Sequence, residues 1–310
     1  MAVDLGFEYD LARFIDFRDA VECDRVRGIP RTELTQHVNP DFRIAVADDP
    51  AEFYRSFAAD LVDRIRAARD DGRTFVAILP VGPMPQYELA ARMINAERIA
   101  LDHVHTFNMD EYANEDGVTA PVSWAGAFQR AMRERFFALV DRELQPPDDQ
   151  IHFPTTEAIG DYSARLEDLG GADVCYGGIG WCGHIAFWES HLGLEFGDDL
   201  AAYKQAHGRI VELNPMTIMQ NALHTFSSDW SWVPPKAASI GPREILGARD
   251  RSFWLDGECG GPGMSWQRFI ARLVAHGPVN TLVPGSILQE TACGYHILGG
   301  VAQDVTIDFS

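Results

Sequence analysis

The run TFVAILPVG, residues 74–82, decides the fold class. Its continuous apolar stretch ends in a Gly/Pro loop, which is typical of a parallel strand that is buried on both faces. The segment before it, residues 50–71, places apolar residues at helical spacing. A second helix is predicted after the loop, from about residue 86 to residue 97. The pattern is therefore helix, strand and helix in alternation.

The same alternation continues along the chain. Further strands are predicted at residues 41–47, 103–109, 173–180, 252–257, 280–285 and 295–300, and a helix at residues 124–140. Strands separated by helices require crossovers, so we expect a Rossmann-like, doubly wound α/β fold with a mainly parallel sheet and helices on both faces. Ligands of such sheets bind outside the carboxyl ends of the strands. Residues 1–40 show no clear strand and are interpreted as an N-terminal extension of a catalytic domain, residues 41–310.

Charge and composition limit the partners of the chain. It has 310 residues and a formal net charge of −20, from 26 Lys+Arg against 46 Asp+Glu. A field this negative repels phosphate backbones and anionic lipid, so nucleic acid and membrane surfaces are poor candidate partners. No apolar run approaches the roughly 20 residues that span a bilayer, and no signal-peptide pattern opens the chain, so a cytoplasmic protein is expected. Its 5 cysteines lack a CxxC pair, which favours reduced thiols.

Two carboxylates follow the strand predicted at residues 103–109. They are Asp110 and Glu111, in the segment NMDEY. Adjacent residues on an extended chain point to opposite faces, so these two side chains are not expected to touch. One of them could act as a general base while the other is structural. An ordinary acidic loop after a strand is the alternative.

The segment GGIGWCGHIAFWE, residues 177–189, follows another predicted strand. Glycines at a strand end allow the backbone to approach a ligand closely, and His184 just beyond them is placed to exchange a proton near neutral pH. The spacing is not the dinucleotide fingerprint GxGxxG, and the Walker lysine is absent, so nucleotide binding is not expected. A hydrogen-bonded structural histidine is the alternative.

A metal site is a further alternative. His103 and His105 share one face of a strand, and Cys182 and His184 could join them as nitrogen and sulfur ligands. An exposed or strand-end histidine is the simpler interpretation of His103. Cys182 could also act as a nucleophile activated by a histidine, although cysteine is commonly a small buried apolar residue.

Taken together, these segments resemble the glucosamine-6-phosphate deaminase/isomerase family, which shares its fold with 6-phosphogluconolactonases. The matching text is TFNMDEY (106–112), GGIGxxGHIAFxE (177–189), LPVGPMP (79–85) and GSILQ (285–289). The resemblance extends from about residue 41 to the end, and HIAFxE favours the deaminase branch. It implies an enzyme of carbohydrate metabolism that is often homo-oligomeric and needs neither a metal nor a redox cofactor.

The resemblance implies roles for individual residues. Asp110 is the base that moves a proton between C1 and C2 of an open-chain sugar, and His184 opens the pyranose ring with the help of Glu189. Aldose–ketose isomerisation needs one base that reaches both carbons, and ring opening needs an acid–base group near neutrality. Glu111 is a further catalytic candidate. The expected substrate-binding residues are Gly82, Pro83, Met84, Gly178, Gly180, Trp181, Cys182, Gly183 and Trp188, and the two tryptophans either stack on a sugar face or pack in the core.

The chain departs from the family at the histidine. Cys182 stands where the family has the aspartate that orients and charges this residue. A neutral thiol does not stabilise an imidazolium as a carboxylate does, so His184 is expected to have a different pKa.

The phosphate pocket departs as well. Gly82 is followed by Pro83, Met84 and Pro85 in place of small hydroxyl residues, and proline has no N–H to give. The family lysine maps near Gly260 and the family arginine near Leu223, so both cations are lost. The cations that could substitute for them are Arg243, Arg268 and Lys236.

We therefore expect an aldose–ketose isomerase or amino-sugar deaminase that acts on a small-molecule sugar whose phosphate is absent or differently bound. One alternative is a noncatalytic sugar-binding or regulatory homologue, because fold alone does not establish chemistry. Another is a metal-dependent sugar hydrolase or isomerase that uses Cys182 and His184, and a lactonase is a third.

Overall fold

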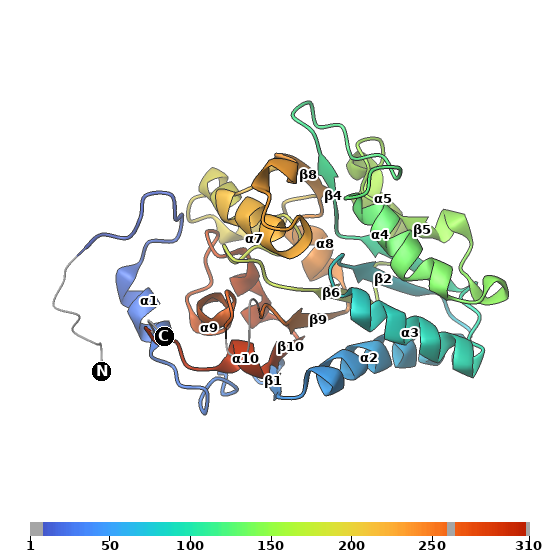
Figure 1. Cartoon of the computed structure of the whole chain (residues 1–310), viewed down its shortest axis with the longest axis horizontal. Helices are drawn as coiled ribbons and strands as arrows, with labels where there is room; N and C mark the ends of the chain where they lie inside the picture. Colours follow the sequence, from blue (N-terminus) through green and yellow to red (C-terminus); the bar gives the residue numbers. More distant parts are fainter. Residues whose placement is uncertain (1–8, 259–263, 308–310) are drawn as a thin grey trace.

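A seven-stranded sheet forms the centre of the molecule, and every pair of neighbouring strands in it is parallel (Figure 1). The computed structural model describes residues 9–258 and 264–307. The strand order is β1-β10-β9-β6-β2-β3-β5. The strands are β1 (Phe42–Ala47), β2 (Phe75–Leu79), β3 (Val104–Asn108), β5 (Ile151–His152), β6 (Val174–Gly177), β9 (Asp250–Leu255) and β10 (Cys293–Leu298). This sheet confirms the predicted α/β class.

The order of the strands reverses beside β2. All five residues of β2 are buried, as its unbroken apolar run requires. The chain passes from β2 to its neighbour β3 on one side, whereas β6 enters the sheet on the other side of β2. Ligands of open α/β sheets bind at such a reversal, outside the carboxyl ends of the strands. The loops that follow β2, β3 and β6 meet at this edge.

Helices connect and cover the strands. They are α1 (Ala20–Arg27), α2 (Pro50–Asp70), α3 (Met84–Glu97), α4 (Phe128–Arg135), α5 (Tyr162–Asp168), α6 (Leu200–Lys204), α7 (Pro215–Thr225), α8 (Pro242–Gly247), α9 (Arg268–His276) and α10 (Gly299–Ala302). The Asp49 side chain caps α2, and Phe53, Phe57 and Leu61 bury the apolar stripe of this helix. In Figure 1, α2 and α3 lie side by side below the sheet and α7 lies above it.

A second, antiparallel sheet was not predicted. It contains β4 (Asp110–Ala113), β8 (Lys236–Ser239) and β7 (Arg209–Glu212), in the order β4-β8-β7. These strands have four residues each, too short for an alternating pattern to stand out in the sequence. The alternative of an ordinary acidic loop after β3 is wrong, because residues 110–113 form a buried strand.

Two predicted elements are wrong in type or length. Residues 280–285 do not form a strand, because the Asn280 side chain accepts the N–H of Leu282 and holds a turn. A 3₁₀ helix, Pro284–Glu290, follows that turn. The helix predicted at residues 124–140 is limited to α4 and one 3₁₀ turn, Phe137–Leu139.

The described part of the N-terminal extension packs on the end of the chain. Its helix α1, which the sequence did not reveal, contacts α9. The fully buried guanidinium of Arg272 on α9 donates to the carbonyl oxygens of Ile29 and Ala302, at 2.9 and 3.0 Å. The boundary at residue 40 stays a prediction.

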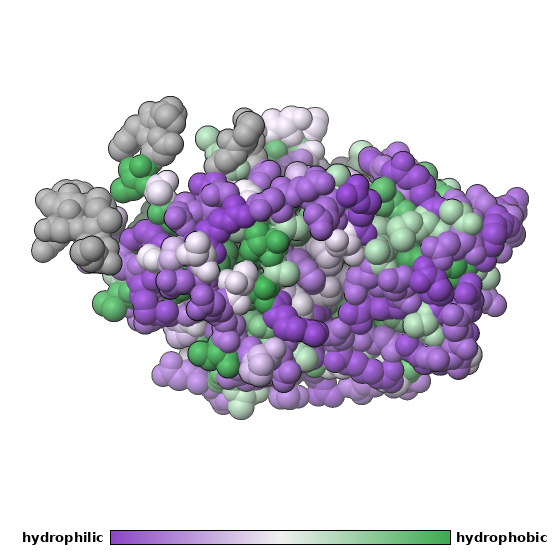
Figure 2. Space-filling view, turned by 90° about the horizontal axis from the view of Figure 1, so that it is seen from below, coloured by the Kyte–Doolittle hydropathy of each residue, from purple (hydrophilic) through white to green (hydrophobic). Residues whose placement is uncertain are grey.

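The surface is as polar as the composition indicates. Figure 2 shows a face covered mostly by hydrophilic residues, with hydrophobic patches between them. None of the helices described is both long and apolar enough to cross a membrane. The cysteines within the described ranges, Cys23, Cys175, Cys182 and Cys293, are buried free thiols, and Cys259 lies outside those ranges.

Candidate active site

Asp110 is buried at the carboxyl edge of the sheet, where β3 ends and β4 begins. Its side chain is 7% exposed. Burial raises the pKa of Asp110 to about 8, while the charge of His184 lowers it and the carboxylates of Glu111 and Glu189 raise it. A carboxyl group with this pKa takes up and releases a proton close to neutral pH, as a general base must.

Glu111 points away from Asp110 and caps a helix. Its carboxylate accepts the backbone N–H groups of Tyr112, Phe128 and Gln129 at 3.0, 2.9 and 2.8 Å. Phe128 and Gln129 are the first residues of α4, so Glu111 fixes where this helix begins. Burial raises the pKa of Glu111 to about 7, although these backbone hydrogen bonds lower it. As strand alternation predicts, the two adjacent carboxylates do not touch.

Three side chains converge on one carboxylate oxygen of Glu189. Together with it they form what we term the Glu189 cluster, which comprises Cys182, His184, Glu189 and Thr217. The Oε2 atom of Glu189 lies 3.1 Å from His184 Nδ1, and it accepts the Cys182 thiol at 3.0 Å and the Thr217 hydroxyl at 2.9 Å. Thr217 lies on α7, and no sequence motif pointed to it.

The Glu189 cluster decides the charge of His184. Burial disfavours the charged imidazole, but Glu189 and Cys182 favour it more strongly, so the pKa of His184 lies well above its usual value. The sequence led us to expect a different pKa for His184, because Cys182 replaces the family aspartate. In the structure the carboxylate of Glu189 lies 3.1 Å from His184 Nδ1 and favours its charged form.

Glycines make room for the His184 ring. A Cβ on Gly180 would lie 1.9 Å from His184 Nε2, so only glycine fits at position 180. Gly183 has a φ of +85°, which is a left-handed conformation that side chains rarely adopt. Gly178 lies closer to the sheet, where its Cβ would meet Trp254 O at 3.4 Å. Gly178, Gly180 and Gly183, which were predicted to bind substrate, thus leave room for the His184 ring and for close approach of the backbone.

The loop after β2 offers few hydrogen-bond donors. Gly82 has a φ of +140°, and Pro83 precedes the first turn of α3 without capping it. The Met84 N–H is bonded to the Gly82 oxygen at 2.7 Å, and neither Pro83 nor Pro85 has an N–H. This helix start therefore lacks the converging N–H groups that make other helix N-termini anion sites.

A carboxylate and an amide stand next to that loop instead. The Gln86 side chain is 1% exposed and its Nε2 donates to Asp256 Oδ2 at 3.3 Å. Among the described residues, the Oε1 atom of Gln86 is buried without a hydrogen-bond partner. Asp256 follows β9 at the same edge of the sheet. Neither residue was singled out in the sequence, because no motif contains them.

The cations proposed as substitutes are engaged elsewhere. Lys236 Nζ donates to Glu115 O at 2.8 Å, and Arg268 Nε donates to Gly300 O at 3.1 Å. Leu223 is an exposed leucine on α7, and Gly260 lies outside the described residues.

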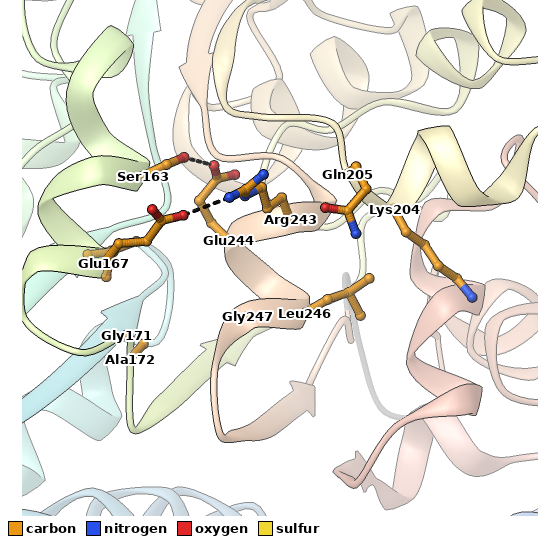
Figure 3. A pocket seen from close by; sticks show the side chains of 11 residues that line it. Ser163, Glu167, Gly171, Ala172, Lys204, Gln205, Arg243, Glu244, Leu246 and Gly247 are labelled. Carbon is orange, nitrogen blue, oxygen red and sulfur yellow. Dashed lines mark hydrogen bonds and ion pairs between the residues drawn. The ribbon is translucent and has the colours of Figure 1, made fainter.

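Arg243 belongs to a different pocket, of about 430 Å³, which is shown in Figure 3. It pairs there with Glu167 at 2.8 Å. Gly171 and Gly247, which also line this pocket, precede β6 and β9. The pocket therefore lies at the amino ends of these strands, away from the carboxyl edge that holds Asp110.

His103, just before β3, and His105, within it, are not part of the group of metal-binding side chains. His103 Nε2 lies 3.1 Å from Ile65 O, and His105 stacks on His152. Within the described ranges, the one group of metal-binding side chains is Cys182, His184 and Glu189, whose donor atoms lie within 4.8 Å of one another. Of the residues in the metal alternative, only Cys182 and His184 belong to this group, and Glu189 joins them.

The two tryptophans differ in their surroundings. Trp188 is 1% exposed and packs against Tyr203, with the Arg209 guanidinium over its ring at 5.2 Å. No face of Trp188 is free for a sugar, so the core-packing alternative describes it. Trp181 is 36% exposed, and its backbone N–H donates to Gln220 Oε1 at 2.7 Å.

The fold and site together define a class of protein. Among solved structures, a monomeric glucosamine-6-phosphate deaminase superposes with a TM-score of 0.69 at 22% identity, covering 84% of this chain and 98% of that one. The 6-phosphogluconolactonase of Thermotoga maritima superposes with a TM-score of 0.57 at 13% identity, covering 82% and 98%. These likenesses show a shared fold.

Sequence relatives identify the family. The glucosamine-6-phosphate deaminase of Caenorhabditis elegans is 32% identical over 217 residues, 68% of this chain and 73% of that protein. Glucosamine-6-phosphate deaminase 2 of Bacillus subtilis is 31% identical over 256 residues, 80% and 91% respectively. No protein-family model matches. The chain belongs to the glucosamine-6-phosphate deaminase family, which confirms the resemblance and the expectation of an enzyme of the amino-sugar deaminase and isomerase type.

Proposed function

We propose that the protein moves a proton between C1 and C2 of an open-chain sugar or amino sugar, with Asp110 as the base. The observation that carries this proposal is the buried Asp110, with a pKa of about 8, beside the charged His184 and its Glu189 cluster. A base of this strength, held in a dry site, suits the weakly acidic C–H next to a carbonyl group.

In the proposed reaction, His184 first opens the pyranose ring. The charged His184 passes its Nε2 proton to the ring oxygen as the C1–O5 bond breaks, and the same nitrogen accepts the proton of the C1 hydroxyl as the aldehyde forms. Asp110 then removes the C2 proton while the aldehyde oxygen gains one, which gives an enediol. Return of the proton from Asp110 to C1, with loss of the C2 hydroxyl proton, gives the ketose. Glu189 holds His184 in its charged form, and Glu111 positions the strand of Asp110 by capping α4.

With a 2-amino sugar the same steps release ammonia. Removal of the C2 proton gives an enolamine, and protonation at C1 gives an imine at C2. Water adds to this imine, and its breakdown leaves a ketose and ammonia. The names of the sequence relatives, all glucosamine-6-phosphate deaminases in the comparisons above, support this outcome for the present chain.

We further propose that the substrate carries no phosphate at the end remote from C1. Pro83 and Pro85 remove donors from the loop after β2, and Asp256 and Gln86 add acceptor oxygens beside it. A phosphate there would be repelled by the carboxylate, whereas a sugar hydroxyl can donate to it. The unpartnered Gln86 oxygen supports a hydroxyl-donating ligand.

The test uses the purified full chain in D2O. Phosphorylated and unphosphorylated hexoses, hexosamines and ketoses are compared, with deuterium uptake at C1 and C2 and ammonia followed by NMR. We expect exchange with the unphosphorylated sugars and little with the phosphates. Exchange only with the phosphates would refute the proposal about the remote end, and no exchange with any sugar would favour a noncatalytic sugar-binding protein. A homo-oligomer stays a prediction that light scattering of the same sample checks.

The Glu189 cluster supports one second candidate, a metal-dependent sugar hydrolase or isomerase. Thiolate, imidazole and carboxylate donors, here 3.0 to 3.4 Å apart, are the ligand set that Zn²⁺ accepts. Elemental analysis decides between the two candidates. A stoichiometric metal whose removal stops the reaction would favour the second candidate, whereas full activity after chelation favours the first.

A further inference from the structure

A second cavity lies behind the active-site loop. It has a volume of about 450 Å³, within the range of small-molecule pockets. Leu11, Ile15 and Phe17 of the N-terminal extension form one wall, and Ile270 and Leu273 of α9 form another. Trp181, Cys182 and Trp266 line this cavity, but Asp110, His184 and Asp256 do not. The cavity therefore does not contain the proposed catalytic residues, although Trp181 and Cys182, two of the residues expected to bind substrate, line it.

One carboxylate gives this apolar cavity its polarity. Asp16 Oδ2 accepts the Ser190 hydroxyl at 2.6 Å and the Asn214 amide at 3.2 Å. Both of these partners are neutral, and no arginine or lysine of the described residues forms an ion pair with Asp16. Arg27 also lines the cavity, but it is paired with Asp24. The cavity therefore combines apolar walls with one negative charge that has no positive partner.

Asp16 also connects the cavity to the Glu189 cluster. Ser190 directly follows Glu189, and Asn214 caps α7, the helix that carries Thr217. An occupant of the cavity would contact Cys182, whose thiol is bonded to Glu189. The N-terminal extension thus touches two of the elements that hold His184 in place.

We propose that this cavity is a binding site for a small molecule with an apolar body and a cationic or hydroxyl end, of which a primary alkylamine is the simplest example. The apolar walls bind the body through burial of its surface, and Asp16 binds the donor end. This site is additional to the proposed function and does not depend on it.

Calorimetric titration with hexylamine, hexanol and hexanoate, in the absence of sugar, tests the proposal on the full chain. We expect saturable one-to-one binding, tightest for the amine and weakest for the carboxylate. Asp16→Asn should weaken amine binding about tenfold and change hexanol binding little, since only the charge is lost. No saturable binding, or hexanoate as the tightest ligand, would overturn the proposal.

A second test of the proposal uses a variant in which a larger side chain fills the cavity. Ala12 lines the cavity but is exposed, so Ala12→Trp fills space without disturbing the core. Ala67→Trp, at an exposed position on α2, is the matched control. We expect Ala12→Trp alone to abolish binding of both hexylamine and hexanol, and equal binding by the two variants would refute this location. Because sugar turnover is not measured, failure here is distinguishable from failure of the proposed function.

Discussion

The two halves of the candidate active site differ in how closely they follow the family resemblance. The proton-transfer half, with Asp110, His184 and Glu189, keeps every residue that the resemblance assigns to the chemistry except the aspartate replaced by Cys182. The remote half, with the loop after β2 and the loop after β9, keeps none of the phosphate-binding features the family pattern predicts. The structure adds Gln86 and Asp256 there.

This difference shows which residues of each half can be exchanged independently of the others. Proton transfer depends on groups that fix one another, since Glu189 Oε2 alone accepts or contacts three side chains. A change at one member alters the others. In the proposed site, the remote half consists of separate loops, so its residues can be exchanged without disturbing the base. Substitution of Asp110 tests the proton-transfer half, substitution of Asp256 tests the remote half, and the pH dependence tests the pKa of Asp110.

The largest expected effect is that of Asp110→Asn. The amide has nearly the same shape but does not take up a proton, so deuterium exchange at C1 and C2 should fall by about 10²–10⁴-fold with every sugar. Glu111→Gln is the matched control, because it weakens the cap of α4 and should lower the melting temperature more than it lowers turnover. Retained exchange in Asp110→Asn would remove Asp110 as the base.

A smaller effect is expected from Asp256→Asn. Loss of this carboxylate removes repulsion of an anionic end, so the ratio of kcat/KM for phosphorylated over unphosphorylated sugar should rise by about tenfold. The exchange measurement with matched sugar pairs gives this ratio. An unchanged ratio would show that Asp256 does not face the remote end of the substrate.

The smallest effect is expected in the pH dependence of kcat/KM. Because the base works when deprotonated, kcat/KM should rise with pH and level off above about 8, the pKa of Asp110. The same pKa, raised from 3.8, means that the folded state holds this proton more tightly than the unfolded chain does. Stability is therefore lost as pH rises from about 4 to about 8.

Thermal melts of Asp110→Asn check the same pKa independently of activity. The variant lacks the titrating group, so its melting temperature relative to the parent protein should be higher at pH 9 than at pH 5. An equal difference at both pH values, together with a flat rate profile between pH 6 and pH 9, would show that Asp110 titrates in its ordinary range.

The sequence predicted the central sheet because its strands carry strong local signals. The apolar run of β2 and the helical spacing of α2 are continuous over many residues, so neighbouring residues alone define them. The antiparallel sheet escaped prediction, because β4, β7 and β8 are short and held together by residues far apart in the chain. The start of α4 depends on Glu111, 17 residues away from Phe128, which no local pattern reveals.

The residues of the candidate site also divide into those that a local segment reveals and those that only the fold reveals. Asp110, His184 and Glu189 lie in short segments that could be recognised as they stand. Thr217 and Gln86 could not, because each matters only through a partner that the fold brings to it, Glu189 in one case and Asp256 in the other. Trp188 shows the converse, since a residue inside a recognised segment turned into the core.

The geometry of the Glu189 cluster determines the route of exchangeable hydrogen through the site. Nδ1 of His184 is committed to Glu189 and Thr217, which leaves Nε2, beside Gly180, as the only nitrogen open to a ligand. In the proposed reaction the proton that the charged His184 gives to the ring oxygen leaves from Nε2, and the proton of the C1 hydroxyl replaces it on the same atom. One nitrogen would then act twice in each ring opening, and the imidazole would end the step in the protonation state in which it began.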